Sequence, residues 1–373
     1  MQLNNLTAIS PIDGRYRKKL EILSNYFSEF ALIKYRVFVE IQYFIALWEL
    51  EIPQLSKLSK NSVKNIERIF LRFSIEDAMY IKEIEEKINH DVKAVEYFIK
   101  DKFDELGLSK FKEFVHFGLT SQDINNTAIP LMLKNFTTDY YLNKLFEVRN
   151  ELQLLIEKCE GVSVLARTHG QPASPTKLDK EIKVFKVRID EQIKILKNNL
   201  YASKFSGATG NFNAHKVSYP NVDWETFGRN FCEKKLKLHY SFPTTQIEHY
   251  DHYAALCDSK SRINTILIDL CRDMWSYISF DYFNQKINKN EVGSSAMPHK
   301  VNPIDFENAE GNLGLANSIF RHFSQKLPIS RLQRDLTDST VLRNAGVPIS
   351  HSILSFESLI KGLKKLNVNK KKI

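Results

Sequence analysis

The chain has 373 residues, of which 43% are hydrophobic and 26% are charged. This balance is typical of a globular protein with a sizeable core, and it excludes a largely disordered chain. The formal net charge of +9 could suit a nucleic acid, an anionic membrane surface or a polyanionic small molecule. The basic residues are spread along the chain without a nucleic-acid-binding motif, so we expect no nucleic-acid partner and no membrane partner.

The N-terminal segment predicts no targeting signal. Residues 1–16 are polar and are interrupted by Pro11 and Gly14, and no stretch of the chain has the roughly 18 uncharged apolar residues of a membrane span. The spacing of the four cysteines indicates neither a disulfide framework nor a metal site. These cysteines are Cys159, Cys232, Cys257 and Cys271. We therefore expect a cytoplasmic protein with reduced thiols and no metal.

Two long segments without glycine or proline, 54–106 and 244–292, predict helices rather than strands. In both segments apolar residues recur every three or four positions, as on one face of a helix. The second segment predicts a single helix over about residues 247–282, a rod on the order of 50 Å long. Further helices are predicted over residues 138–158, over residues 177–203, from near Pro303 onward, and up to near Leu366.

The helix near Pro303 has a predicted starting point. Asn302 can cap a helix, and proline suits the first helical position. Asp305 and Glu307 would then lie in the first turn, where the helix dipole favours negative charge.

These elements predict an all-α fold, without repeats and without runs of alternating strands. A small helical N-terminal domain is expected over residues 1–110, and a long bundle of about five helices over residues 111–363. The long helices carry apolar residues on more than one face. This pattern predicts that other subunits cover part of the bundle, and a thick core within a single chain is the alternative interpretation.

Three loops between the helices concentrate small, polar and charged side chains: residues 116–123, 167–172 and 293–303. In the third loop, Gly293 permits unusual backbone angles. Two serines, a lysine and a helix start follow it, and together they could hold a carboxylate that gains negative charge during a reaction. A serine-rich turn before a capped helix is an equally good interpretation of the same residues.

The third loop, with the sequence GSSAMPHKVNP, resembles the signature loop of the fumarase/aspartase superfamily. Its AMPHK segment is similar to that of the adenylosuccinate lyases. Supporting motifs occur along nearly the whole chain, namely SPIDGRY, NHDVKAVEYF, HFGLTSQDINN, RTHGQP, SGATGNFNAH, TTQIE and RDLTDSTVLRN. Together they resemble the longer bacterial subtype of the adenylosuccinate lyases.

The resemblance implies an elimination reaction of purine biosynthesis. Fumarate would leave adenylosuccinate, giving AMP, and would also leave the succinylated carboxamide nucleotide SAICAR, giving AICAR. A base removes a proton beside a carboxylate, and an acid protonates the departing nitrogen. His169 matches the general acid and Ser294 the general base, with Ser295 as the alternative base and a substrate contact. The reaction implies no cofactor.

The resemblance also implies a set of residues that bind the nucleotide substrate. His90 would orient the catalytic groups, Lys300 and Asn302 would hold the carboxylate that gains charge, and the 334–343 segment would bind the phosphate. The full set is Arg15, Tyr16, Asn89, His90, Asp91, Thr120, Ser121, Gln246, Ser295, Lys300, Val301, Asn302, Asn308, Arg334, Ser339, Thr340 and Arg343.

The family further implies a homotetramer in which three subunits build each active site. By comparison with the longer subtype, residues 364–373 are expected to be the remnant of a further helical domain. Two alternatives remain open. One is another member of the superfamily, such as an argininosuccinate lyase or a cycloisomerase. Either of these enzymes would lack the phosphate contacts of Arg334, Ser339 and Arg343. The other is a catalytically inactive helical assembly protein with the same fold.

Overall fold

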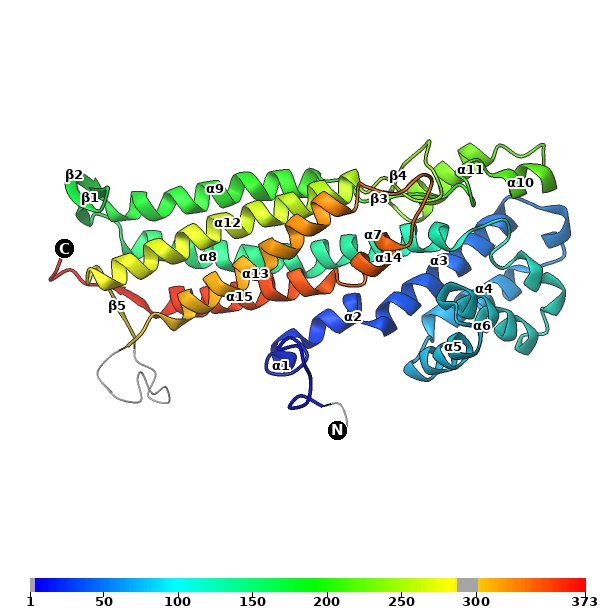
Figure 1. The fold of residues 1–373 in the computed structure, drawn as a ribbon, viewed down its shortest axis with the longest axis horizontal. Helices are drawn as coiled ribbons and strands as arrows, with labels where there is room; N and C mark the ends of the chain where they lie inside the picture. The colour runs from blue at the N-terminus through cyan, green and yellow to red at the C-terminus, as the bar shows by residue number, and fades with distance from the viewer. Residues whose placement is uncertain (1–3, 287–300) are drawn as a thin grey trace.

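The computed structural model describes residues 4–286 and 301–373. Long helices lie side by side along the longest axis of the molecule, and a smaller group of helices lies at one end (Figure 1). This arrangement confirms the predicted all-α fold with a long five-helix bundle. The bundle helices are α8 (Leu142–Lys158), α9 (Leu178–Asn198), α12 (Asp251–Ser279), α13 (Ile304–Lys326) and α15 (Gly346–Lys365).

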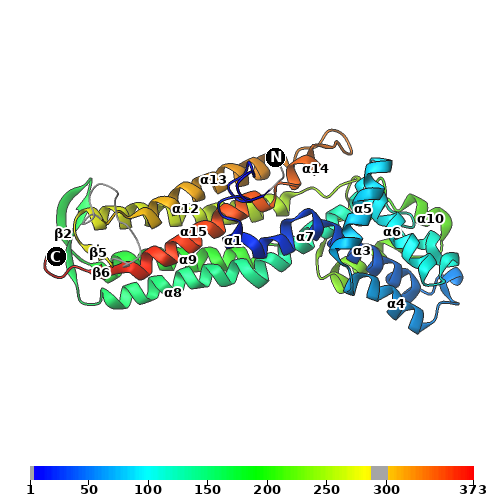
Figure 2. The ribbon, with the colours of Figure 1, turned by 90° about the horizontal axis from the view of Figure 1, so that it is seen from below.

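The smaller group contains the N-terminal helices and the 3-10 turns between them, and α7 connects it to the bundle (Figure 2). A π-helical turn, Thr137–Tyr141, joins α7 directly to α8. The elements before the bundle are α1 (Arg17–Leu20), η1 (Glu21–Leu23), α2 (Ser24–Phe27), α3 (Glu29–Glu49), η2 (Pro53–Leu55), α4 (Lys60–Leu71), α5 (Ile75–Ile88), α6 (Asp91–Glu105), η3 (Ser109–Phe114) and α7 (Ser121–Phe136).

Two hydrophobic cores hold the described part of the chain together. The first lies between the long helices and includes Leu267 and Phe356, which are fully buried. The second combines side chains of α3 to α7 with residues 205–240, among them Phe103 and Trp224. The N-terminal helices therefore share their core with α10 (Asn213–Ser218) and α11 (Trp224–Asn230), which follow much later in the sequence.

Several helices begin where the sequence supplies a cap. The α5 helix begins with a capping box, in which Asp77 N donates to Ser74 Oγ at 3.3 Å and Ser74 N donates to Asp77 Oδ2 at 3.0 Å. The helix predicted from Pro303 begins one residue later, at Ile304. Pro303 has a ψ of 45°, outside the helical region, and no side chain caps this end. The capping role predicted for Asn302 is therefore wrong, whereas Asp305 and Glu307 do lie in the first turn.

The sequence did not predict the three small two-stranded sheets of the described residues. They pair β1 (Ser163–Thr168) with β2 (Gln171–Lys177), β3 (Ala202–Ser203) with β4 (His239–Tyr240), and β5 (Phe283–Gln285) with β6 (Leu366–Val368). The strands are short and most of their side chains do not alternate between core and solvent, so they lack the usual period-two signal. Among the described helices, none is long and apolar enough to cross a membrane.

Candidate active site

A cavity of about 620 Å³ lies where α3, α6 and α7 meet the segment that contains α14 (Thr337–Leu342). Eight of the residues predicted from the sequence line this cavity, although they come from three separate segments of the chain. They are Asn89, His90, Asp91, Ser121, Arg334, Ser339, Thr340 and Arg343. The fold thus brings eight of the seventeen predicted substrate-binding residues together.

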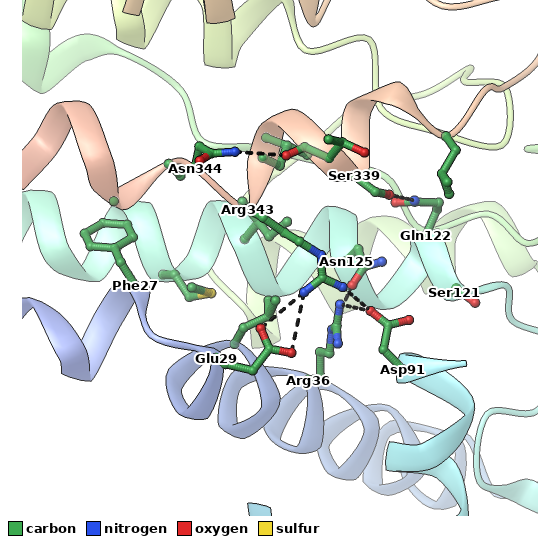
Figure 3. A pocket seen from close by; sticks show the side chains of 18 of the residues that line it. Phe27, Glu29, Arg36, Asp91, Ser121, Gln122, Asn125, Ser339, Arg343 and Asn344 are labelled. Atoms are coloured by element: carbon green, nitrogen blue, oxygen red, sulfur yellow. Dashed lines mark hydrogen bonds and ion pairs between the residues drawn. The ribbon is translucent and has the colours of Figure 1, made fainter. Parts of the chain in front are cut away.

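Two arginines converge on one carboxylate oxygen in this cavity (Figure 3). Arg36 Nη2 donates to Asp91 Oδ2 at 2.7 Å, and Arg343 Nη2 donates to the same oxygen at 2.8 Å. Arg343 Nη1 also lies 3.2 Å from Glu29 Oε2. Burial by itself raises the pKa of Asp91, but the Arg36 guanidinium, the Val92 backbone N–H and Arg343 together outweigh burial, and the pKa lies below its ordinary value. Asp91 is therefore a charged anchor between two cations.

His90 stands at the N-terminus of α6 and faces solvent. Its Nδ1 accepts a hydrogen bond from Lys93 N at 3.1 Å. In the neutral ring the proton then resides on Nε2. The left-handed backbone of Asn89, with a φ of 53°, ends α5 and turns the chain so that His90 lies at the cavity wall.

A second polar group surrounds Ser339. Its Oγ accepts from Gln122 Nε2 at 3.3 Å and from Arg334 Nη2 at 3.4 Å. Arg334 Nη1 reaches Gln246 Oε1 at 3.4 Å, which links the predicted substrate contact Gln246 to the cavity wall. Arg334 Nε and Gln122 Oε1 are buried without a hydrogen-bond partner among the described residues. These two atoms can therefore still pair with a ligand or a water molecule.

The loop that carries Thr120 and Ser121 is held in place by Asp123, which is fully buried. Asp123 Oδ2 accepts from Thr120 N at 2.8 Å. Its Oδ1 accepts from Lys204 Nζ at 2.6 Å and also from Ser206 N and Gly207 N, which ties this loop to the segment after β3. Thr120 itself does not line the cavity, whereas Ser121 does.

The same loop requires a glycine at position 118. Its φ is +68°, and a Cβ added there would lie 2.7 Å from the buried ring of His215. Any other residue would combine backbone strain with a steric clash.

His169 lies far from the cavity in the same chain. It occupies the tip of the β1–β2 hairpin, with a φ of 53° and an exposed side chain, at the far end of the bundle (Figures 1 and 2). Val301, Asn302 and Asn308 lie at the start of α13, toward that end, and Val301 O accepts from Gln285 Nε2 at 3.0 Å. Ser294, Ser295 and Lys300 lie outside the described residues.

Arg15 and Tyr16 also lie apart from the cavity. They precede α1, where the Arg15 guanidinium is 5.8 Å from the centre of the Tyr16 ring. The Tyr16 side chain packs against the core of the bundle and Arg15 is exposed. A single chain therefore brings together only part of the predicted site.

Several polar residues of the cavity were not predicted from the sequence: Glu29, Arg36, Gln122 and Asn125. Arg36 did carry a recognisable signal, because it and Glu40 are charged residues four positions apart in an otherwise largely apolar helix, α3. Charged side chains in such a position are buried only when they have partners or a function. Asn125 gave no comparable signal, because amides are common on helix surfaces.

The match to a family model places this chain in a class of enzymes, the fumarase/aspartase-type lyases, and its fold agrees with that class. A family model described as "Lyase" matches residues 14–316, and one described as "Adenylosuccinate lyase C-terminal" matches residues 330–373. A solved fumarate lyase from a Mesorhizobium species superposes with a TM-score of 0.74 at 17% identity, covering 94% of this chain and 76% of that one. A 3-carboxy-cis,cis-muconate lactonizing enzyme from Pseudomonas putida follows with a TM-score of 0.71 at 16% identity, covering 94% and 78%.

Curated relatives narrow this class to one family. The chain is 57% identical to the adenylosuccinate lyase of Dictyostelium discoideum, over all of this chain and 82% of that protein. It is 48% identical to the adenylosuccinate lyase of Vibrio cholerae, over 99% of this chain and 82% of that protein. The chain therefore belongs to the adenylosuccinate lyase family, whose members are carbon–nitrogen lyases.

Proposed function

We propose that this protein catalyses the β-elimination of fumarate from adenylosuccinate, giving AMP, and from SAICAR, giving AICAR. One observation carries the proposal: Arg36, Arg334 and Arg343 line one cavity together with Ser339, whose hydroxyl accepts a hydrogen bond from Arg334. The substrate has one phosphate and two carboxylates, and guanidinium groups bind both kinds of oxyanion through paired hydrogen bonds. The family membership supplies the reaction, and the cavity supplies a fitting binding site.

In the proposed reaction, Ser294 removes a proton from the succinyl carbon beside a carboxylate. The electron pair left on that carbon forms the double bond of fumarate as the carbon–nitrogen bond breaks, and His169 gives a proton to the departing nitrogen. Ser295 is the alternative base. Lys300 and Asn302 would hold the carboxylate that gains charge. The elimination balances without a redox cofactor or a metal.

We further propose a homotetramer in which different subunits contribute to each active site, and we expect it in the cytoplasm. The distance between His169 and the cavity along the bundle supports shared sites, because one chain cannot place the acid beside its own cavity (Figure 1). The exposed tip of the β1–β2 hairpin suits this role, since an exposed histidine can enter a neighbour's cavity. The four cysteines are free and buried, which agrees with a reducing compartment.

The first experiment measures the products directly. The purified chain is mixed with adenylosuccinate, and AMP and fumarate are followed by chromatography; we expect equal amounts of both. His169→Ala should lower kcat by at least about 100-fold, because the leaving nitrogen loses its proton donor. His322→Ala, an exposed histidine on α13, is the matched control and should retain activity.

A folded protein that releases neither product from adenylosuccinate would contradict the proposal. Fumarate released from argininosuccinate instead would favour another lyase of the superfamily. Inactivity toward both substrates would favour a helical assembly protein.

A further inference from the structure

Arg36 is a buried cation at the wall of the cavity. It projects from α3, a helix whose other buried side chains are almost all apolar, and it is 3% exposed. Two of its three nitrogens are bound: Nε donates to Asn125 Oδ1 at 2.9 Å and Nη2 donates to Asp91 Oδ2 at 2.7 Å. These two hydrogen bonds fix the plane of the guanidinium group (Figure 3).

The third nitrogen, Nη1, is buried and has no hydrogen-bond partner among the described residues. A buried donor without an acceptor is costly, most of all on a charged group, so natural proteins rarely keep one without a use. Arg36 lines the cavity, and Arg343 binds the same oxygen of Asp91 that Arg36 binds. The two guanidinium groups therefore meet at one carboxylate oxygen in the wall of the cavity.

We propose that Arg36 is a further substrate-binding residue, whose Nη1 donates a hydrogen bond to an anionic oxygen of the nucleotide substrate beside Arg343. This inference rests on the proposed function and adds one specific contact to it. The motifs that carry the family resemblance do not include Arg36. It is identified by its burial, its fixed plane and its unpaired nitrogen.

The charges of the cavity are consistent with a bound anion. Three arginines line it, against the carboxylates Glu29 and Asp91. A third carboxylate, Glu85, is already paired with Lys82 at 2.7 Å. Arg334 makes its two hydrogen bonds with neutral groups, Gln246 and Ser339. The three arginines therefore exceed the carboxylates Glu29 and Asp91 by one positive charge, and a bound anion would balance it.

The oxyanion could be the phosphate or a carboxylate of the substrate, because a guanidinium group recognises both in the same way. Separate titrations with AMP and with fumarate distinguish the two. AMP carries the phosphate alone and fumarate carries the carboxylates alone. Both can be measured at equilibrium by calorimetry, without turnover.

The test compares the parent with Arg36→Lys, which keeps the positive charge but loses the planar guanidinium group and its paired hydrogen-bond donors. We expect the Kd of either AMP or fumarate to rise by about tenfold or more, and the affected ligand identifies the oxyanion. Arg149→Lys is the matched control, because Arg149 is paired with Asp190 outside the cavity. Values of Kd within about twofold of the parent for both ligands would overturn the proposal.

Arg36 could instead act only through Asp91, as a positioning residue. Asp91→Asn weakens that anchor but leaves the Arg36 side chain in place. If Nη1 touches the ligand, Arg36→Lys should weaken binding by a similar factor in the Asp91→Asn background. If the effect disappears in that background, Arg36 makes no ligand contact of its own and the proposal is wrong.

A structure of the parent with AMP or with fumarate tests the proposal even if the Arg36 variants do not fold. An anionic oxygen within hydrogen-bond distance of Arg36 Nη1 in one complex is expected, and its absence from both complexes would contradict the inference. A parent that binds and turns over substrate, combined with unchanged binding in Arg36→Lys, would refute this inference alone. A parent that binds neither ligand would refute the proposed function and this inference together.

Discussion

Lys260 is a buried lysine that lowers the free energy of unfolding of the bundle. It lies on α12, is 1% exposed, and has no carboxylate partner among the described residues. Its Nζ lies 3.7 Å from the centre of the Tyr141 ring and donates to Thr137 Oγ1 at 3.2 Å. Burial lowers the pKa of Lys260 from 10.5 to about 7, because the charged ammonium is poorly solvated there.

We predict that Lys260→Met raises the free energy of unfolding at pH 6 by roughly 2–4 kcal/mol, because it removes this penalty. In the parent, the unfolded state holds the proton more tightly than the folded state. The penalty is therefore complete below about pH 7 and fades as the pH rises from about 7 toward 10.5. Urea unfolding at pH 6 and at pH 9 should show a smaller gain at pH 9.

The control for Lys260 is Lys194→Met, which changes an exposed lysine on α9 and should alter stability by less than about 0.5 kcal/mol at either pH. An equal gain from Lys260→Met at both pH values, or a loss, would contradict the explanation.

At the scale of elements, the pairing of β5 with β6 fixes the last part of the chain against the end of α12. Lys286 N donates to Lys365 O at 2.8 Å and Asn369 N donates to Tyr282 O at 2.9 Å, which extends the pairing on both sides. Leu366 is fully buried within this pair and belongs to the core of the bundle. The pair brings residues about 80 positions apart to the segment that precedes the signature loop.

We predict that Leu366→Ala lowers the free energy of unfolding by about 2–4 kcal/mol, through lost burial and a new cavity. Chemical denaturation of the parent and the variant at the same chain concentration measures this change. Leu332→Ala is the matched control, because that leucine is 89% exposed and its loss should cost less than about 0.5 kcal/mol. Equal effects of the two substitutions would show that β6 contributes little to the fold.

At the scale of the whole molecule, the distance between His169 and the cavity has a direct consequence. If the cavity of one subunit receives the hairpin of another, two inactive variants can restore each other. His169→Ala and Ser294→Ala subunits, dissociated together and re-formed as mixed oligomers, should recover about a quarter of the parent activity if the two residues of each site lie on different chains and mix at random.

The controls for this mixing are each variant re-formed alone, which should stay inactive. Activity that does not recover in oligomers shown to be mixed, for example by mass spectrometry of labelled subunits, would contradict shared sites.

The sequence alone predicted the helical class, the course of the bundle helices and the family. The expected helix over residues 247–282 contains α12, and the helix expected over residues 177–203 contains α9. Such elements depend on contacts between residues three or four positions apart, so periodicity and breakers reveal them. Helix starts were less accurate: the helices expected from residues 138 and 247 begin at Leu142 and Asp251. Asn302 does not cap α13, because the backbone angle of Pro303 is outside the helical region.

Only the tertiary structure decided which polar groups meet. Arg36 reaches Asp91 and Asn125 across 55 and 89 positions of sequence, and Arg343 reaches Asp91 across 252. The motifs identified His90 and His169 together, but the fold places one at the cavity and the other at the far end of the bundle. Local pattern cannot encode such distances, because they arise from how the long helices pack, and a side chain's partners are fixed only when that packing is complete.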